Sequence, residues 1–141
     1  MSSTPIPQGK YVPAVRHGDL IITSGMTPRD NGVLIMSGKV KIADEPEHYR
    51  KAVAQAAKNA LSAAKSILLP DEHIVRIISM TVYVNAEDGY TAHARFADLA
   101  SDYFRETLGD HGIASRTSIG VASLPGNAPC EIQIIAEASR E

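Results

Sequence analysis

The distribution of hydrophobic and polar residues divides the chain into two helical segments and several strand-like ones. Helical spacing of apolar residues predicts a long helix that begins at residues 44–47 and ends before Pro70. A second apolar stripe, from Phe96 to Phe104, predicts another helix that ends near Gly109. Alternating or β-branched runs predict strands over residues 11–16, 20–23, 33–36, 73–84, 115–122 and 130–136.

Two helices of this length can cover only one face of a sheet built from these strands. The pattern therefore predicts a sheet of four to six strands with both helices on one face. The other face is expected to pack against another copy, because a large exposed apolar face marks an interface. A turn at residues 124–127 predicts a hairpin of the last two strands, which would bring Arg116 near Glu131. Residues 1–10 read as an irregular arm, and 1–141 as one domain.

Charge and cysteine content narrow the classes of partner and compartment. The net charge is −2 and no Lys/Arg run is present, which disfavours a nucleic-acid partner. Cys130 is the single cysteine, and one thiol cannot form an intrachain disulfide, as is typical of a reducing compartment. Neither an apolar signal core nor a run of about 18 apolar residues occurs, so we expect a cytoplasmic protein without a membrane partner.

Motifs for metals and cofactors are absent from the sequence. The five histidines show no HxH or HxxxH spacing, and no glycine-rich phosphate loop occurs. Cys130 lies among apolar neighbours, which indicates a buried structural thiol rather than a nucleophile. The sequence therefore predicts no metal site and no cofactor.

Two charged residues interrupt the apolar strands near the end of the chain. Arg116 opens one strand, and Glu131 shares a face of the other with Gln133. A planar guanidinium suits a bidentate clamp for a carboxylate, and a carboxylate can hold or activate water. Arg116 can equally pair with a surface acid, and Glu131 can belong to a solvated sheet face. Spacing alone leaves both interpretations open for each residue.

Three segments of the chain resemble the sequence pattern of one known family. SRTSIGVASLPGNAPCEIQIIAEA, at residues 115–138, is similar to the family's C-terminal signature. GKYVPAVRHGDLIITSGMTPRD, at residues 9–30, resembles its N-terminal segment, and VRIISMTVYVN, at 75–85, resembles its central strand. The similarity covers residues 9–138 in the family's order. The family that the chain resembles is the Rid (YjgF-like) family, part of which is labelled endoribonuclease L-PSP.

The resemblance implies a fold, an assembly and an activity. The fold would be an α+β subunit with a mixed sheet, like that of Bacillus-type chorismate mutase. Three such subunits would form a homotrimer with ligand clefts between neighbouring subunits. An enzyme of the best-studied branch hydrolyses reactive 2-imino and enamino acids to 2-oxo acids and ammonia, without a cofactor. By the same resemblance, Arg116 would bind the substrate carboxylate and Glu131 the attacking water. The other pocket residues that it implies are Tyr11, Ser24, Gly25 and Ser118, the last at a position whose backbone helps to hold the carboxylate.

The chain also departs from the family pattern. Ala114-Ser115-Arg116-Thr117 stands where Pro-Ala-Arg-Ser is usual, and Met26 replaces a glutamine. The region between residues 85 and 112 is longer than in the imine deaminases and differs in its residues. These differences fall around the implied cleft, so they bear on substrate preference and on turnover itself.

Three functions are therefore weighed. The first is imine or enamine deamination of a small imino acid. The second is non-catalytic binding of a small carboxylate metabolite, or a partner or holdase-like role. The third is endoribonuclease activity, which ranks last because neither a basic patch nor a paired-histidine acid/base arrangement can be read from the sequence.

Overall fold

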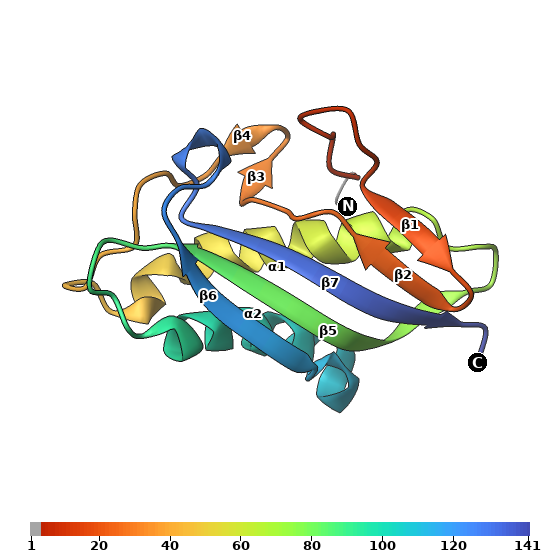
Figure 1. Cartoon of the computed structure of the whole chain (residues 1–141). Helices are drawn as coiled ribbons and strands as arrows, with labels where there is room; N and C mark the ends of the chain where they lie inside the picture. Colours follow the sequence, from red (N-terminus) through yellow and green to blue (C-terminus); the bar gives the residue numbers. More distant parts are fainter. Residues whose placement is uncertain (1–3) are drawn as a thin grey trace.

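The computed structural model describes residues 4–141 as one mixed sheet backed by two helices (Figure 1). The five strands run in the order β1-β2-β7-β5-β6, and β3 and β4 form a separate two-stranded sheet. The main-sheet strands are β1 (Ala14–His17), β2 (Leu20–Thr23), β5 (His73–Asn85), β6 (Ser115–Val121) and β7 (Cys130–Ser139). The remaining elements are β3 (Arg29–Asp30), β4 (Val33–Leu34), α1 (Arg50–Lys65), α2 (His93–Leu108) and the short 3-10 helices η1 (Pro46–Tyr49), η2 (Gly109–Gly112) and η3 (Pro125–Asn127).

Both helices lie on the same face of the main sheet, as the amphipathic pattern predicts (Figure 1). The alanines of α1 let the helix approach the sheet closely, and the face of α1 that they form is fully buried. The expected acidic start is refined: η1 precedes α1, and Asp44 accepts a hydrogen bond from the hydroxyl of Tyr49 instead of capping the helix. Across residues 4–141, no helix is long and apolar enough to cross a membrane.

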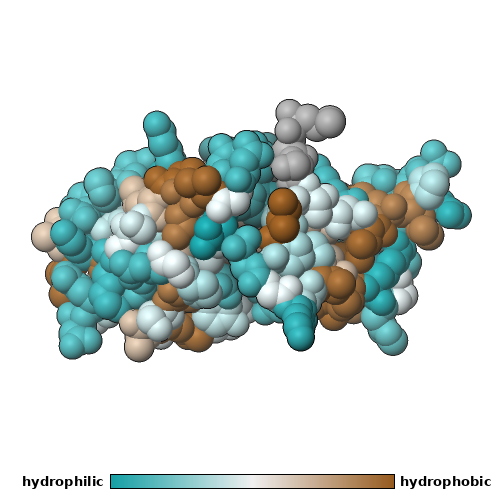
Figure 2. Space-filling view, turned by 90° about the horizontal axis from the view of Figure 1, so that it is seen from above, coloured by the Kyte–Doolittle hydropathy of each residue, from teal (hydrophilic) through white to brown (hydrophobic). Residues whose placement is uncertain are grey.

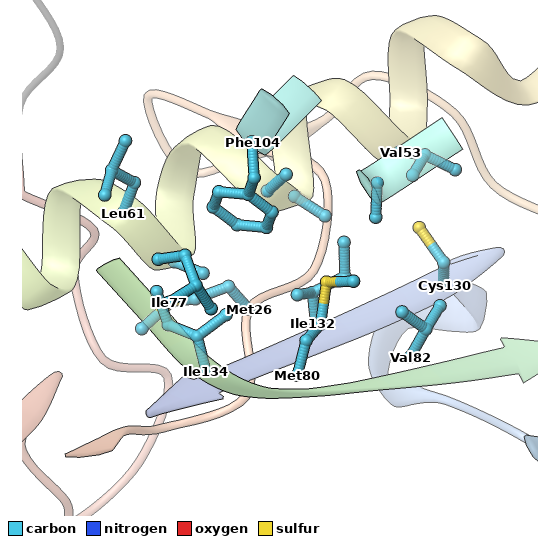
Figure 3. Close-up of a cluster of buried hydrophobic side chains, with 14 of the residues drawn as sticks. Met26, Val53, Leu61, Ile77, Met80, Val82, Phe104, Cys130, Ile132 and Ile134 are labelled. Carbon is cyan, nitrogen blue, oxygen red and sulfur yellow. The ribbon is translucent and has the colours of Figure 1, made fainter. Parts of the chain in front are cut away.

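The core fills the space between the helices and one face of the sheet (Figure 3). Ile132 and Ile134 of β7 and Met80 of β5 point toward α1 and α2, where Phe104 of α2 meets them. Cys130 belongs to the same layer and is completely buried, which raises the pKa of its thiol. A thiol held neutral in this way is a packing residue, as the sequence predicted.

The connection from β5 through α2 to β6 is a crossover between parallel strands. This crossover places β6 beside β5 at the edge of the sheet, and β5 lies between β6 and β7. The predicted hairpin of the last two strands is therefore wrong. Local turn chemistry at residues 124–127 is present as η3, but it joins two strands that pair with β5 from opposite sides.

The other face of the main sheet is not covered by any element within residues 4–141 (Figure 1). The strand registers align its side chains in rows, with Ile22 opposite Ile135 and with Tyr83 between Glu131 and Ile119. Ile119 is 43% exposed. This face, called the open face below, therefore mixes apolar and polar side chains.

The N-terminal strand and the fourth strand are both shorter than predicted. Pairing of β1 begins at Ala14, because residues 8–13 form bends in which Tyr11 donates its backbone N–H to Gly9. Of residues 33–36, Val33 and Leu34 form β4, which pairs with β3, and Ile35 donates a backbone hydrogen bond to Pro28. Seen from the side of β3 and β4, hydrophobic side chains gather in separate groups among hydrophilic ones (Figure 2).

One ion pair fastens the edge strand β1 to the turn that precedes β5. The guanidinium of Arg16 donates two hydrogen bonds to Glu72, of 2.6 and 2.7 Å, and the backbone N–H of Leu69 donates a third to the same carboxylate. The bond from Arg16 is the main reason that the pKa of Glu72 is lowered to about 2.

Replacing Glu72 by Gln is expected to destabilise the fold at neutral pH. A lowered pKa means that the ionised carboxylate stabilises the folded state above the ordinary pKa, near 4.5. That contribution is lost as the pH falls toward 2, so the difference between wild type and Glu72→Gln should be largest at pH 7 and smallest near pH 2. Denaturant unfolding at both pH values measures it, and an equal difference at each would contradict the assignment.

Candidate functional site

Arg116 lies on β6 with its side chain toward α2, on the helix-covered side of the sheet. It is paired with the core residue Met80 across the parallel strands, so the two side chains share that side. Its Nη1 donates to Oδ1 of Asp98 at 2.8 Å and to the hydroxyl of Ser101 at 3.0 Å, while Nη2 donates to the carbonyl of Ala94 at 3.2 Å. The guanidinium is thus held by one turn after another of α2.

Ser118 continues the same row along β6. Its hydroxyl donates a hydrogen bond of 2.8 Å to the carbonyl of His93, at the first turn of α2. The imidazole of His93 lies so close to Gly120 that a Cβ at this position would overlap Nε2. The alternate residues Arg116, Ser118 and Gly120 therefore seat β6 against the N-terminal half of α2.

A second cluster forms where the chain leaves β2. Met26 and Ile132 exchange two backbone hydrogen bonds, of 2.8 and 2.9 Å, which fix the segment after β2 beside β7. Gly25 and Glu131 each precede one member of this pair, and they meet on the open face. A Cβ on Gly25 would overlap the carboxylate of Glu131, so only glycine leaves room for that side chain as it stands.

Glu131 has the chemical character of an acid/base group. Burial raises the pKa of its carboxyl above the ordinary value. No hydrogen bond to this carboxyl is formed within residues 4–141, and Tyr83 is its neighbour across β5. A half-buried carboxyl without a fixed partner can accept or give a proton to a ligand.

Ser24 and Tyr11 belong to the wall of this second cluster. The hydroxyl of Ser24 donates to the carbonyl of Val12 at 2.7 Å, which ties the loop to the N-terminal arm. The hydroxyl of Tyr11 accepts the backbone N–H of Gln8 at 3.1 Å. Tyr11 and Gly25 line a cavity of about 280 Å³ that also borders β3 and Lys58 of α1.

The predicted site residues therefore separate into two clusters within one chain. Arg116 and Ser118 face the helices, whereas Glu131 faces the open side, with β5 between them. Strand spacing and rise place the α-carbons of Arg116 and Glu131 roughly 14 Å apart. The expectation that these two side chains are near each other in one subunit is wrong, since the crossover puts β6 and β7 on different sides of β5. The 280 Å³ cavity contacts neither residue.

Asp98 and Ser101 are site residues that the sequence reasoning missed. With Ala94 they recur at helical spacing along α2, and all three contact Arg116. Asp98 and Ser101 are three positions apart, a spacing that places both polar side chains on one face of the predicted helix. That spacing indicates a contact with Arg116 only when the parallel crossover is known to place α2 over β6.

Gly25 offers a direct test of the contact with Glu131. We expect Gly25→Ala to cost about 1 kcal/mol of unfolding free energy, because the new methyl group must displace the carboxylate. In a Glu131→Ala background the same substitution should cost almost nothing, since the obstacle is gone. Chemical denaturation of the four proteins in this double-mutant cycle measures the coupling, and strictly additive effects would show that the two side chains do not touch.

A family model matches almost the whole chain. The model described as Endoribonuclease L-PSP matches residues 1–138. The chain belongs to this family. Its membership, in the Rid or YjgF-like group, confirms the resemblance read from the sequence.

Individual relatives of the L-PSP family agree with this assignment. A RutC family protein of Aquifex aeolicus is 28% identical over 136 residues, covering 94% of this chain and 91% of the relative. The crystal structure of an Agrobacterium tumefaciens protein of unknown function superposes with a TM-score of 0.84 at 28% identity, covering 97% of this chain and 86% of the other. TdcF of Escherichia coli, solved with bound serine, has a TM-score of 0.65 at 21% identity, with 96% and 94% covered. That last likeness shows the shared fold.

Proposed function

We propose that this L-PSP family protein hydrolyses reactive 2-imino acids, and the enamines in equilibrium with them, to 2-oxo acids and ammonia. The site would lie between two copies of the chain, with Arg116 from one and Glu131 from the other. The observation that most supports a catalytic role is the carboxyl of Glu131, half-buried, with a raised pKa and no hydrogen-bond partner within the described chain.

A second copy of the chain would allow Arg116 and Glu131 to contact the same substrate. In a single chain, Arg116 and Glu131 point to opposite faces of the sheet and cannot grip the same small molecule. No element within residues 4–141 covers the open face, and β6 is a sheet edge, so both can meet another copy. We propose the homotrimer implied by the family resemblance as that assembly, and the cytoplasm as its location.

The proposed chemistry assigns one task to each cluster. Arg116 binds the carboxylate of the imino acid through its guanidinium. Glu131 accepts a proton from water as the water oxygen attacks the imine carbon, and then returns a proton to the nitrogen. The new hydroxyl group then gives up its proton, which Glu131 passes to the same nitrogen, so that the carbon–nitrogen bond breaks, ammonia leaves, and the carbon becomes the ketone of a 2-oxo acid. Imine hydrolysis is already easy in water, so positioning supplies most of the effect.

The test generates 2-imino acids in place with an amino-acid oxidase and traps the survivors with semicarbazide. The proposal predicts that the protein lowers the amount of trapped imine, and that an equal amount of heat-denatured protein does not. The side chain of the imino acid can be varied to rank substrates. No acceleration with any imino acid, at protein concentrations that match those of the oxidase, would contradict a deaminase.

Non-catalytic binding of small carboxylates is a second candidate that one observation favours. The Nε edge of the Arg116 guanidinium forms no hydrogen bond within residues 4–141, so it can receive a carboxylate whether or not any reaction follows. TdcF, which shares the fold, contains serine, a small ligand with a carboxylate. Calorimetric binding of 2-oxo acids without any imine turnover would select this candidate. Ribonuclease activity is not proposed, because no observation at either cluster favours it.

A further inference from the structure

The two Nη atoms of the Arg116 guanidinium are held by α2, whereas its Nε edge is open. Nη1 uses its hydrogens on Asp98 and Ser101, and Nη2 uses one on the carbonyl of Ala94. Nε forms no hydrogen bond with any residue in the range 4–141. The side chain is 22% exposed. A ligand carboxylate that approaches the Nε edge would therefore meet Arg116 while Asp98 still holds Nη1.

The carboxylate of Asp98 is largely exposed to solvent beside Arg116. Its side chain is 64% exposed, and only Oδ1 is engaged by Arg116. The neighbouring charges on α2 are already paired elsewhere, Arg95 with Glu45 and Asp102 with Arg50. Asp98 is thus the acidic group that an anionic ligand would face when it reaches Arg116.

We infer that Asp98 acts as a charge filter, which weakens the binding of anionic ligands at Arg116 and excludes dicarboxylates most strongly. The inference rests on the proposed function, because it assumes that Arg116 receives a ligand carboxylate. Like charges about 4 to 5 Å apart in water change an equilibrium by about fivefold. A second carboxylate adds a further repulsion from Asp98, which is smaller than the first because it lies farther away. The favoured substrates are therefore imino acids with one carboxylate and an uncharged side chain.

The experiment measures, by calorimetry, the affinity of wild type and Asp98→Asn for three ligands of graded charge: pyruvamide, pyruvate and 2-oxoglutarate. Asn keeps an oxygen that can accept the Nη1 hydrogen bond, so the substitution removes charge and preserves geometry. We expect Asp98→Asn to bind pyruvate about fivefold and 2-oxoglutarate more than tenfold more tightly, with no change for pyruvamide. Asp102→Asn, one turn along α2 and paired with Arg50, is the matched control and should change none of the affinities.

Other outcomes would overturn the inference in distinguishable ways. Weaker pyruvate binding by Asp98→Asn would mean that Asp98 positions Arg116 rather than repelling ligands. Unchanged affinities, with binding abolished by Arg116→Ala, would reject the filter and leave the proposed function standing. Binding that survives Arg116→Ala, or no binding by either wild type or Asp98→Asn, would reject both.

Discussion

Replacing Arg116 by Ala is expected to weaken the binding of 2-oxo and 2-imino acids by about 100-fold or more. Two charge-assisted hydrogen bonds to a ligand carboxylate, each of about 1.5–3 kcal/mol, would be lost. The loss should appear mainly as a higher KM in the imine-clearance assay, because carboxylate binding is made in the ground state as well as in the transition state. Arg116→Lys keeps the charge but loses the planar guanidinium, so its affinity for the ligand should lie between those of wild type and Arg116→Ala.

The matched control for this variant is Arg105→Ala. Arg105 lies on the same helix-covered side of the molecule, toward the end of α2, where it forms an exposed pair with Asp110 at 3.5 Å. Its removal should leave affinity and turnover at wild-type values, since exposed pairs contribute little. Equal losses in the two variants would point to a general effect of removing a positive charge, and would remove Arg116 from the site.

Replacing Glu131 by Gln is expected to lower imine turnover by about 100-fold, which is at the lower end of what a positioned acid/base group contributes. Gln keeps the shape of the side chain but cannot take a proton from water. The loss should appear in kcat, with ligand affinity retained, in contrast to the Arg116 variants. Wild-type turnover in Glu131→Gln would remove this residue from the mechanism.

The raised pKa of Glu131 predicts how turnover by the wild type, and its stability relative to Glu131→Gln, depend on pH. As a base, Glu131 must be ionised, so turnover by the wild type should rise with pH through a value above 4.5 and then level off. Stability should move the other way, because a raised pKa means that the fold favours the protonated form. Glu131→Gln should therefore be more stable than wild type at pH 7 and equally stable below pH 4.5, as thermal unfolding at both pH values will show.

Much of the fold was predictable because it depends on local periodicity. The apolar stripe of α1, the long apolar run of β5 and the stripe that includes Phe96 and Phe104 of α2 each occupy the predicted layer. These segments are long enough for their period to identify the element and its buried face. Both helices could be assigned to one face because two helices of this length can cover only one face of the sheet.

Strand neighbours were less predictable, because they depend on contacts far apart in the sequence. A strong turn between residues 121 and 130 suggested a hairpin, but β5 pairs with both β6 and β7 and separates them. That long-range pairing decides that Arg116 faces α2 while Glu131 faces the open side. The residue types at the site were therefore identified from the sequence, whereas their arrangement was not.

Asp98 illustrates the same limit at the level of a single contact. The possibility that Arg116 pairs with an acid was recognised, but its partner lies 18 positions earlier on another element. Only the crossover geometry brings that turn of α2 against β6. Within residues 4–141 Glu131 has no hydrogen-bond partner and faces away from Arg116, so the proposed site needs a second copy of the chain.

A complementation experiment tests the two-copy site most directly. Arg116→Ala and Glu131→Gln are produced separately, then unfolded together in equal amounts and refolded, and imine clearance is compared with that of each variant alone. If each cleft takes Arg116 from one copy and Glu131 from another, random assembly leaves about a quarter of the clefts intact, and about a quarter of wild-type activity should return. A mixture that stays as inactive as its two components, while refolded wild type regains full activity, would contradict a site shared between copies.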